Sequence, residues 1–357
     1  MRALLSLVFV MGCDAEEEQT ESDQPLVPEL SEGWNELPGG GETICSRGDD
    51  YAFFVRKGTV NRVVVDFQGG GACWNAGTCG LADAIFSDSV DGVRDALMNT
   101  DDHQGIIDTN NEENPFADWY HVVVPYCTGD IHWGDATTDY GAVTIEHKGG
   151  VNAKAVVDWV ADNFIDPEHV FVTGCSAGAY GAIMWTPSLI EAYPNATIAQ
   201  LGDSGAGIVT ADWFAQSFPS WNAESSFPTW IPALDPSQND VQGLELTDLY
   251  TRIGTFYPDV VFSQYNSSAD GVQQFFFGVM GGEEDQWRPL MVDSIETIRE
   301  GTPNFRAYLE SADRHCIIPG QATYDVQVGD TRFIDWMTTL AEGGTPEDVA
   351  CPECVSP

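Results

Sequence analysis

The segment from His169 to Gly181 holds the residues whose types and spacing are best suited to chemistry. It runs from a short β-branched stretch, through Gly174-Cys175-Ser176-Ala177-Gly178, into a small apolar stretch. A strand, a Gly-x-Ser-x-Gly turn and a helix are typical of a nucleophile elbow, which exposes its central serine on a strained turn. The glycines let strand and helix approach closely. The pattern predicts Ser176 as a nucleophile; a glycine-rich turn in an ordinary β–α unit is the alternative.

A second glycine-rich turn, Gln68-Gly69-Gly70-Gly71-Ala72-Cys73-Trp74, follows the Val-rich stretch from Val60 to Phe67, which is predicted as a buried strand. Hydrolases of the α/β class place an oxyanion-binding N–H group in such a turn. A phosphate-binding loop is the alternative, but no Lys-Ser/Thr pair follows and no dinucleotide motif is present. The N–H groups expected to hold a developing negative charge are those of Gly70, Gly71, Ala72 and, after the elbow, Ala177.

A general base is expected near the end of the chain. His315 follows the stretch from Phe305 to Leu309, which is predicted as the last strand. This position completes the order nucleophile, acid, base that is typical of α/β-hydrolases. The sequence therefore predicts His315 as the base, although a lone histidine is more often structural.

Two aspartates compete for the role of the acid that orients the base. Asp270 follows a predicted strand, Asp259 to Tyr265, and lies between serine and histidine in the chain. Asp203 lies one strand earlier, in Gly202-Asp203-Ser204-Gly205, a sequence that also surrounds the nucleophile of all-β serine proteases. We favour Asp270 as the acid because it follows a late strand. We favour Ser176 over Ser204 as the nucleophile because this chain alternates strands with helices.

The remaining pattern predicts an α/β fold. The apolar stretch from Trp119 to Pro125 is predicted as a strand and Gly150 to Phe164 as an amphipathic helix. We expect a three-layer, α/β-hydrolase-like sandwich with a mainly parallel sheet and an irregular cap over residues 214–240. Ligands of open α/β sheets bind beyond the carboxyl ends of the strands. The residues predicted to line a substrate cleft there are Trp74, His132 and Trp133.

Three segments together resemble the pectin acetylesterase/Notum family of serine carboxylesterases. They are Phe67-Gln68-Gly69-Gly70-Gly71-Ala72-Cys73-Trp74-Asn75, Gly174 to Gly178, and His315-Cys316, and the resemblance extends roughly from Gly40 to Ile318. It implies an α/β-hydrolase-like fold, Asp270 as the acid, and hydrolysis of a small ester or an acetylated glycan without a metal or organic cofactor. A lipid or polyester esterase of the same fold, and a lipid-anchored binding protein without activity, are the alternatives.

Acidic residues greatly outnumber basic ones. The 357 residues include 56 Asp and Glu against 14 Lys and Arg, a formal net charge of −42, and 43% of them are hydrophobic, enough for a large core. The charge argues against binding of nucleic acids or anionic lipid surfaces through basic patches. We attribute it to solubility in a salty exterior, where screening limits repulsion to about 10 Å. A monomer is expected.

The N-terminus has the features of a targeting segment. A positive residue precedes an apolar run, Ala3 to Met11, that is too short to span a bilayer. The run ends at Cys13 in a pattern that resembles the lipobox of bacterial lipoproteins, whose cysteine carries the lipid; a plain secretory signal is the alternative. We expect an exported, envelope-bound or secreted protein, with a signal over residues 1–13, an acidic disordered tether over 14–39 and a single esterase domain over 40–357.

The chain has nine cysteines, which in an exported protein favour disulfides. Catalysis requires the serine Oγ and histidine Nε2 to lie within about 3 Å, so the neighbouring Cys175 and Cys316 are expected to form a bridge. A small buried filler at the elbow is the alternative for Cys175. The adjacency also resembles the arrangement in tannase and feruloyl-esterase-like hydrolases. The remaining expected pairs are local, Cys73 with Cys79 and Cys351 with Cys354, and by elimination Cys45 with Cys127; no metal site is expected.

Overall fold

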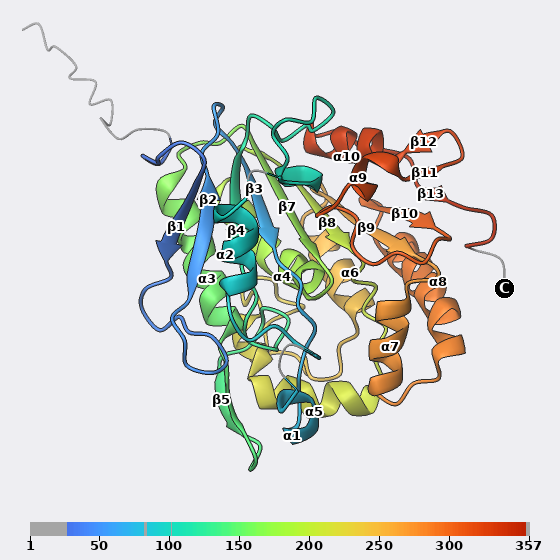
Figure 1. Ribbon diagram of the computed structural model, residues 1–357. Helices are drawn as coiled ribbons and strands as arrows, with labels where there is room; N and C mark the ends of the chain where they lie inside the picture. Colours follow the sequence, from blue (N-terminus) through green and yellow to red (C-terminus); the bar gives the residue numbers. More distant parts are fainter. Residues whose placement is uncertain (1–26, 82–83, 101, 355–357) are drawn as a thin grey trace, which may run out of the picture.

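A nine-stranded sheet forms the centre of the computed structural model, which describes residues 27–81, 84–100 and 102–354 (Figure 1). Its strands follow the order β1-β2-β4-β3-β7-β8-β9-β10-β13. Neighbours from β4 to β13 are parallel, whereas β1 pairs antiparallel with β2 and β2 with β4. The strands are β1 (Trp34–Pro38), β2 (Ala52–Arg56), β3 (Arg62–Phe67), β4 (Tyr120–Val124), β7 (His169–Cys175), β8 (Thr197–Asp203), β9 (Val261–Ser267), β10 (Phe305–Glu310) and β13 (Val349–Ala350).

Helices and short hairpins surround this sheet. The longer helices are α2 (Asp91–Met98), α3 (Gly149–Asn163), α4 (Ala177–Ala192), α5 (Ala211–Trp221), α6 (Leu246–Phe256), α7 (Gly271–Val279), α8 (Glu284–Gly301) and α10 (Phe333–Ala341). Short helical turns are α1 (Ala76–Cys79), α9 (Ala322–Asp325), η1 (Gly105–Ile107) and η2 (Ala223–Ser226). The hairpins are β5 (Ala136–Asp139) with β6 (Thr144–His147), and β11 (Gln327–Val328) with β12 (Thr331–Arg332).

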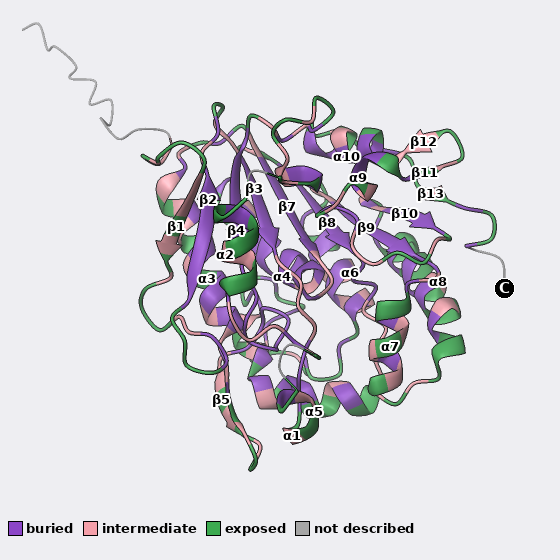
Figure 2. Ribbon diagram, in the orientation of Figure 1, coloured by how far each residue is buried: buried purple, intermediate pink, exposed green. Residues whose placement is uncertain are grey.

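The alternation of side chains along the strands explains the layers. Successive residues of a strand point to opposite faces, and in β3 the side chains of Val63 and Val65 enter one core while Val64 enters another. The first core is completed by α3, α4, α6 and α8, and the second by η1, α9 and α10. Figure 2 shows that the inner strands are buried almost throughout. This arrangement of a mostly parallel sheet between helices confirms the predicted α/β class and is consistent with an α/β-hydrolase.

The parallel strands bring the predicted site residues to one edge of the sheet. Because β3, β7, β8, β9 and β10 run in the same direction, the loops that follow them begin at a common edge. The first glycine-rich turn follows β3, Ser176 follows β7, and Ser204 follows β8. Asp270 lies three residues beyond β9, and His315 lies on the loop after β10.

The structure corrects three predicted boundaries. Trp34–Pro38 forms β1 and pairs with β2, so the expected tether does not extend to residue 39. The strand β10 is not the last, because β13 adds to its edge in parallel. The cap over residues 214–240 is partly regular, since it begins within α5 and includes η2. The predicted signal, Cys13 and the first part of the tether lie outside the described residues.

The described residues have no helix that is both long and apolar enough to span a membrane.

Candidate active site

Ser176 occupies a sharp turn between β7 and α4. Its backbone has φ 55° and ψ −120°, a conformation that costs a non-glycine residue energy. The turn is possible because two glycines flank it: a Cβ on Gly174 would lie 2.3 Å from the carbonyl oxygen of Gly178, and a Cβ on Gly178 would lie 1.8 Å from that of Phe67. The serine therefore stands at the N-terminus of α4, where backbone N–H groups lack helical partners.

The structure brings Asp270 to His315. The Nδ1–H of His315 donates to Oδ2 of Asp270 at 2.8 Å, and the aspartate is fully buried. Asp270 also caps α7: its Oδ1 accepts the backbone N–H groups of Val272 and Gln273, each at 3.0 Å, and its Oδ2 accepts Nε2 of Gln273 at 2.9 Å. These donors hold the carboxylate in place and satisfy its charge. Ser176 and His315 line the same pocket.

Asp203, the competing acid, contacts a different part of the same loop. Its Oδ2 accepts the backbone N–H groups of Ile317 and Ile318 at 2.8 and 2.9 Å, and its Oδ1 accepts the hydroxyl of Ser204 at 3.0 Å. Burial raises the pKa of Asp203 to about 6, while these donors and nearby His315 act in the opposite direction. The carboxylate thus holds the backbone beyond His315 rather than its imidazole.

The glycine-rich turn after β3 packs directly against the elbow. A Cβ on Gly69 would lie 2.6 Å from the carbonyl oxygen of Cys175, and one on Gly71, which has φ +72°, would lie 1.9 Å from that of Ile85. Gly71, Ala72 and Ala177 line the pocket with Ser176, whereas Gly70 is not among its lining residues. Only residues without large side chains allow this approach of the two turns.

The pocket beside Ser176 has two distinct parts. Ser176, Gly71, Ala72, Ala177 and His315 form one end, which we call the polar floor. Most of the remaining lining, which we call the apolar wall, comprises the side chains of Ile131, Trp133, Ile208, Val209, Trp213, Phe214, Phe227, Leu244, Leu246, Leu249, Phe276, Met280 and Trp287. The other lining residues are Tyr180, Ser204, Gly207, Glu245 and Gln273. The empty volume is about 880 Å³ including the open mouth. Among the described residues that line it, Glu245 is the only acidic one and none is Lys or Arg.

Comparison with known proteins agrees with this arrangement. The model of the family described as Pectinacetylesterase matches residues 40–227, which is more than half of the 357-residue chain. The chain belongs to the pectinacetylesterase family of hydrolases. Two proteins of Arabidopsis thaliana are similar to it: pectin acetylesterase 11 is 28% identical over 186 residues, 49% of this chain and 46% of that protein, and pectin acetylesterase 7 is 28% identical over 188 residues, 50% and 47%. The chain thus spans about half the length of these relatives.

The family match covers only part of the site of this pectinacetylesterase-family protein. Residues 40–227 include the glycine-rich turn, Ser176 and Asp203, but end before Asp270 and His315. The resemblance expected from Gly40 to Ile318 is therefore matched only as far as residue 227. The family match therefore does not include Asp270 and His315, whose side chains the structure places 2.8 Å apart.

The three residues predicted to line the cleft have different positions. Trp133 lines the pocket, and its Nε1–H donates to the carbonyl oxygen of Tyr180 at 2.9 Å. Trp74 is not among the lining residues; it packs edge-on against Trp213, with ring centroids 5.6 Å apart. His132 is also absent from the lining: it is buried behind the glycine-rich turn, where its Nε2 donates to the carbonyl oxygen of Gln68 at 2.9 Å.

Burial lowers the pKa of His132 to about 4, so its imidazole is neutral near pH 7. Its role is therefore to support the turn, by holding a carbonyl group of the backbone. The sequence pattern, a polar loop after a strand, does not distinguish a histidine in a cleft from one behind it.

Four disulfides connect the described cysteines. Cys175 and Cys316 form one bridge with Cα atoms 5.5 Å apart, and it links the residue before Ser176 to the residue after His315. The others are Cys45–Cys127, Cys73–Cys79 and Cys351–Cys354. These are the pairs expected from the sequence, and they are typical of extracellular proteins.

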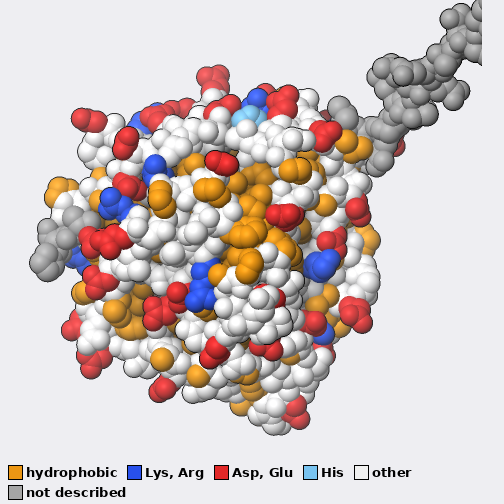
Figure 3. Space-filling model, turned by 180° about the vertical axis from the view of Figure 1, so that it is seen from behind, with side chains coloured by type: hydrophobic (Ala, Val, Ile, Leu, Met, Phe, Trp, Pro, Cys, Tyr) orange, Lys and Arg blue, Asp and Glu red, His pale blue; other side chains and the backbone are white. Residues whose placement is uncertain are grey.

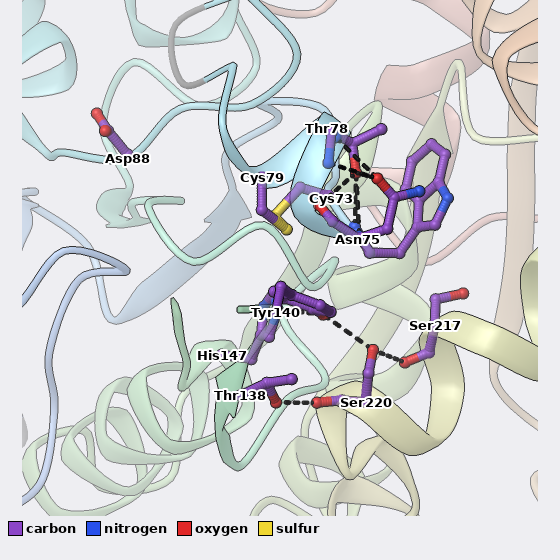
Figure 4. Close-up of a disulfide and its surroundings, with 12 residues drawn as sticks. Cys73, Asn75, Thr78, Cys79, Asp88, Thr138, Tyr140, His147, Ser217 and Ser220 are labelled. Carbon is purple, nitrogen blue, oxygen red and sulfur yellow. Dashed lines mark hydrogen bonds between the residues drawn. A yellow bond between two sulfur atoms is a disulfide. The ribbon is translucent and has the colours of Figure 1, made fainter. Parts of the chain in front are cut away.

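The Cys73–Cys79 disulfide lies next to His147 (Figure 4). Judged only by the distances between their ligand atoms, these three residues could form a metal site. The ligand atoms of Cys73, Cys79 and His147 lie within 4.8 Å of one another. The sulfur atoms are bonded to each other, and both nitrogens of His147 have partners, the hydroxyl of Tyr140 and the carbonyl oxygen of Thr128. Metal ions bind cysteine in its thiolate form, so the disulfide-bonded Cys73 and Cys79 are not suitable metal ligands.

Proposed function

We propose that this protein is an exported serine esterase that hydrolyses small acyl esters, with acetyl esters as the first candidates. The observation that carries the proposal is the 2.8 Å contact between His315 and Asp270. His315 also lines the same pocket as Ser176, whose backbone is strained. A nucleophile on a strained turn, a base oriented by a buried acid and backbone N–H groups at a helix start are the parts that acyl transfer requires.

In the proposed mechanism, His315 Nε2 accepts the proton of Ser176 Oγ as the oxygen attacks the ester carbonyl. Asp270 keeps the imidazole in the tautomer with Nδ1–H and stabilises its charged form. The backbone N–H groups of Ala177, Gly71 and Ala72, which line the pocket, hold the oxyanion. The C–O bond then breaks, and His315 gives its proton to the leaving alcohol. Water attacks the acyl-enzyme with His315 again as the base, which releases a carboxylic acid and regenerates Ser176.

The charge of the protein and of the pocket favours a neutral substrate. The relatives are named pectin acetylesterases, and pectin is a polyanion, which a chain of formal net charge −42 repels at low salt. Figure 3 shows acidic side chains scattered around an apolar band on one face, with several basic side chains among them. We therefore propose that neutral acetylated glycans or small neutral esters react faster than acetylated polygalacturonate in dilute buffer; the opposite order would overturn this choice.

The apolar wall favours a second candidate, an ester with a longer acyl chain. An acetyl group needs little of the wall, whereas each buried methylene contributes about 0.8 kcal/mol. A series of p-nitrophenyl esters from acetyl to dodecanoyl decides between the two: a maximum of kcat/KM at acetyl supports the first candidate, and one at longer chains supports the second.

The same series tests the esterase proposal itself when it is run on the wild type, Ser176→Ala and Ser204→Ala. Hydrolysis that disappears in Ser176→Ala and persists in Ser204→Ala supports Ser176 as the nucleophile. No hydrolysis of any ester by the folded wild type contradicts the proposal and favours a binding protein.

We also propose that the protein is exported as a monomer and tethered to a membrane through a lipid on Cys13. The tether predicts that the protein partitions with membranes and that Cys13→Ser releases it. Recovery of the wild type in the soluble extracellular fraction would contradict the tether.

A further inference from the structure

The end of β8 and the turn after it contact Ser176, the proposed nucleophile, and the residues that directly follow His315, the proposed base. The carbonyl oxygen of Asp203 accepts the backbone N–H of Ser176 at 2.8 Å, which fixes the nucleophile's backbone. The side chain of the same residue accepts the N–H groups of Ile317 and Ile318. These two residues follow His315 by only two and three positions. One buried residue thus holds the elbow with its main chain and the histidine loop with its carboxylate.

Ser204 extends this connection to the residue next to His315. Its hydroxyl donates to Asp203 and accepts the backbone N–H of Cys316 at 2.9 Å. Ser204 and Cys316 both have left-handed backbone, with φ 57° and 60°, which residues other than glycine rarely adopt. The N–H of Ser204 donates to the carbonyl oxygen of Tyr265 at 2.9 Å, so the strained turn is anchored to β9. Strained conformations persist where the surroundings hold them.

We propose that Asp203 and Ser204 are positioning residues, which hold His315 at the distance from Ser176 that proton transfer requires. The proposal rests on the esterase function proposed above and adds a second, non-covalent connection between nucleophile and base. The first connection is the Cys175–Cys316 disulfide, which joins the same two loops one residue away. The disulfide alone limits the distance between the histidine loop and the elbow but lets the loop rotate about the bonds of the bridge. The hydrogen bonds to Asp203 and Ser204 restrict this rotation as well.

The chemistry of Asp203 explains why an ionised carboxylate suits this position. Both of its oxygens face donors: two backbone N–H groups on Oδ2 and a hydroxyl on Oδ1. A carboxylate accepts from both sides. Asparagine has nearly the same shape, but it turns an NH₂ group either toward Ile317 and Ile318 or toward Ser204. Asp203→Asn therefore removes acceptors without opening a cavity.

The first test measures the loop without any substrate. Hydrogen exchange of the backbone N–H groups at Cys316, Ile317 and Ile318 is followed by mass spectrometry of peptides from the wild type and Asp203→Asn. We expect the N–H groups of Ile317 and Ile318, which donate to Asp203 Oδ2, to exchange at least about tenfold faster in the variant. The N–H of Cys316 donates to Ser204 and should change less. Since no catalysis is involved, this result stands or fails independently of the esterase proposal. Unchanged exchange would overturn the proposed connection.

The second test separates positioning from general destabilisation. Asp203→Asn and Ser204→Ala are expected to lower kcat by about 10- to 100-fold, because a displacement of about 1 Å costs on this order. KM should change little in Asp203→Asn, since Asp203 does not line the pocket, whereas Ser204 does. Asn304→Ala is the matched control: it loses hydrogen bonds to Gly254, Tyr257 and Val260 next to the start of β10, at the opposite end of that strand. The control should lower the melting temperature but leave kcat unchanged.

The third test measures the coupling of the two connections. Asp203→Asn is combined with Cys175→Ala and Cys316→Ala, and kcat is compared with that of each parent. If both connections hold the same loop, the combined loss exceeds the product of the separate losses. Strictly multiplicative losses, an effect confined to KM, or an equal loss of kcat in Asn304→Ala would each overturn the positioning role.

Discussion

The polar floor and the apolar wall of the pocket are built in different ways. The floor comes from the ends of neighbouring strands, and its residues are fixed by backbone hydrogen bonds and by Asp270, which accepts four donors. The wall comes mainly from the chain between β8 and β10, including α5, α6, α7 and α8, and is held by apolar packing. In the proposed esterase we therefore expect the floor to determine which reaction is possible, and the wall to determine which acyl group fits.

Substitutions in the polar floor should lower kcat for every substrate to the same extent, and by larger factors than any other substitutions. Ser176→Ala and His315→Ala are each expected to lower kcat by about 10⁴- to 10⁶-fold for short and long esters, because nucleophile and base act as a unit. Thermal unfolding should stay close to that of the wild type. Ser31→Ala, at an exposed position near β1, is the control and should retain full activity. A loss that depends on acyl length would break the distinction between floor and wall.

The acid should matter less than the nucleophile but more than the positioning residues. Asp270→Asn is expected to lower kcat by about 10⁴-fold, because asparagine favours the wrong tautomer of His315. Asp203→Asn should cost about 10- to 100-fold. Steady-state kinetics of the two variants under one set of conditions checks this order. The reverse order would show that Asp203 is the acid.

Removing the Cys175–Cys316 disulfide should change the stability of the protein more than its kcat. The bridge joins residues 141 apart in the chain, and the chain-entropy model gives such a loop about 5 kcal/mol of stability. The Cys175→Ala, Cys316→Ala double variant should unfold at clearly lower denaturant concentration while kcat falls by no more than about tenfold, because Asp203 and Ser204 still hold the loop. Peptide mapping of the non-reduced wild type provides the control; a free thiol at Cys175 would contradict the bridge.

Changes in the wall should have the smallest effects and should depend on the substrate. Ile208→Trp places a larger side chain in the wall and is expected to lower kcat/KM for octanoyl esters by about tenfold relative to acetyl esters, the scale at which apolar pockets discriminate. Acetyl ester hydrolysis should stay within about twofold of the wild type. An equal loss for both esters would mean that this part of the wall also shapes the floor.

The two regions also differ in how far the sequence predicts them. Ser176 and the glycine-rich turn follow from local rules, since a tight turn between strand and helix needs residues without side chains at fixed positions. His315 and Asp270 were predicted from their order along the chain, and the structure places them 2.8 Å apart. Their roles await the kinetic tests above.

Of the wall, the sequence predicts only Trp133, because the other residues come from separate segments of the chain that meet only in three dimensions. Phe214 and Trp287, for example, are 73 positions apart yet line the same pocket. His132 shows the same limit: its loop was predicted at the correct edge of the sheet, but burial behind the turn depends on packing with Phe67 and Tyr126. Residue order favours Asp270 over Asp203 as the acid, but it does not contain the loop geometry by which Asp203 holds the backbone beyond His315.

The most direct test of the central claim is to trap the acyl-enzyme. The wild type is mixed with p-nitrophenyl acetate, quenched in acid within the first turnover and digested. The masses of the peptides are then measured by mass spectrometry. A serine esterase built on Ser176 predicts one acetyl group on the peptide that contains Ser176, absent in Ser176→Ala and strongly reduced in His315→Ala. Acetyl transfer to the peptide that contains Ser204, or rapid release of p-nitrophenol without any acetylated peptide, would contradict it.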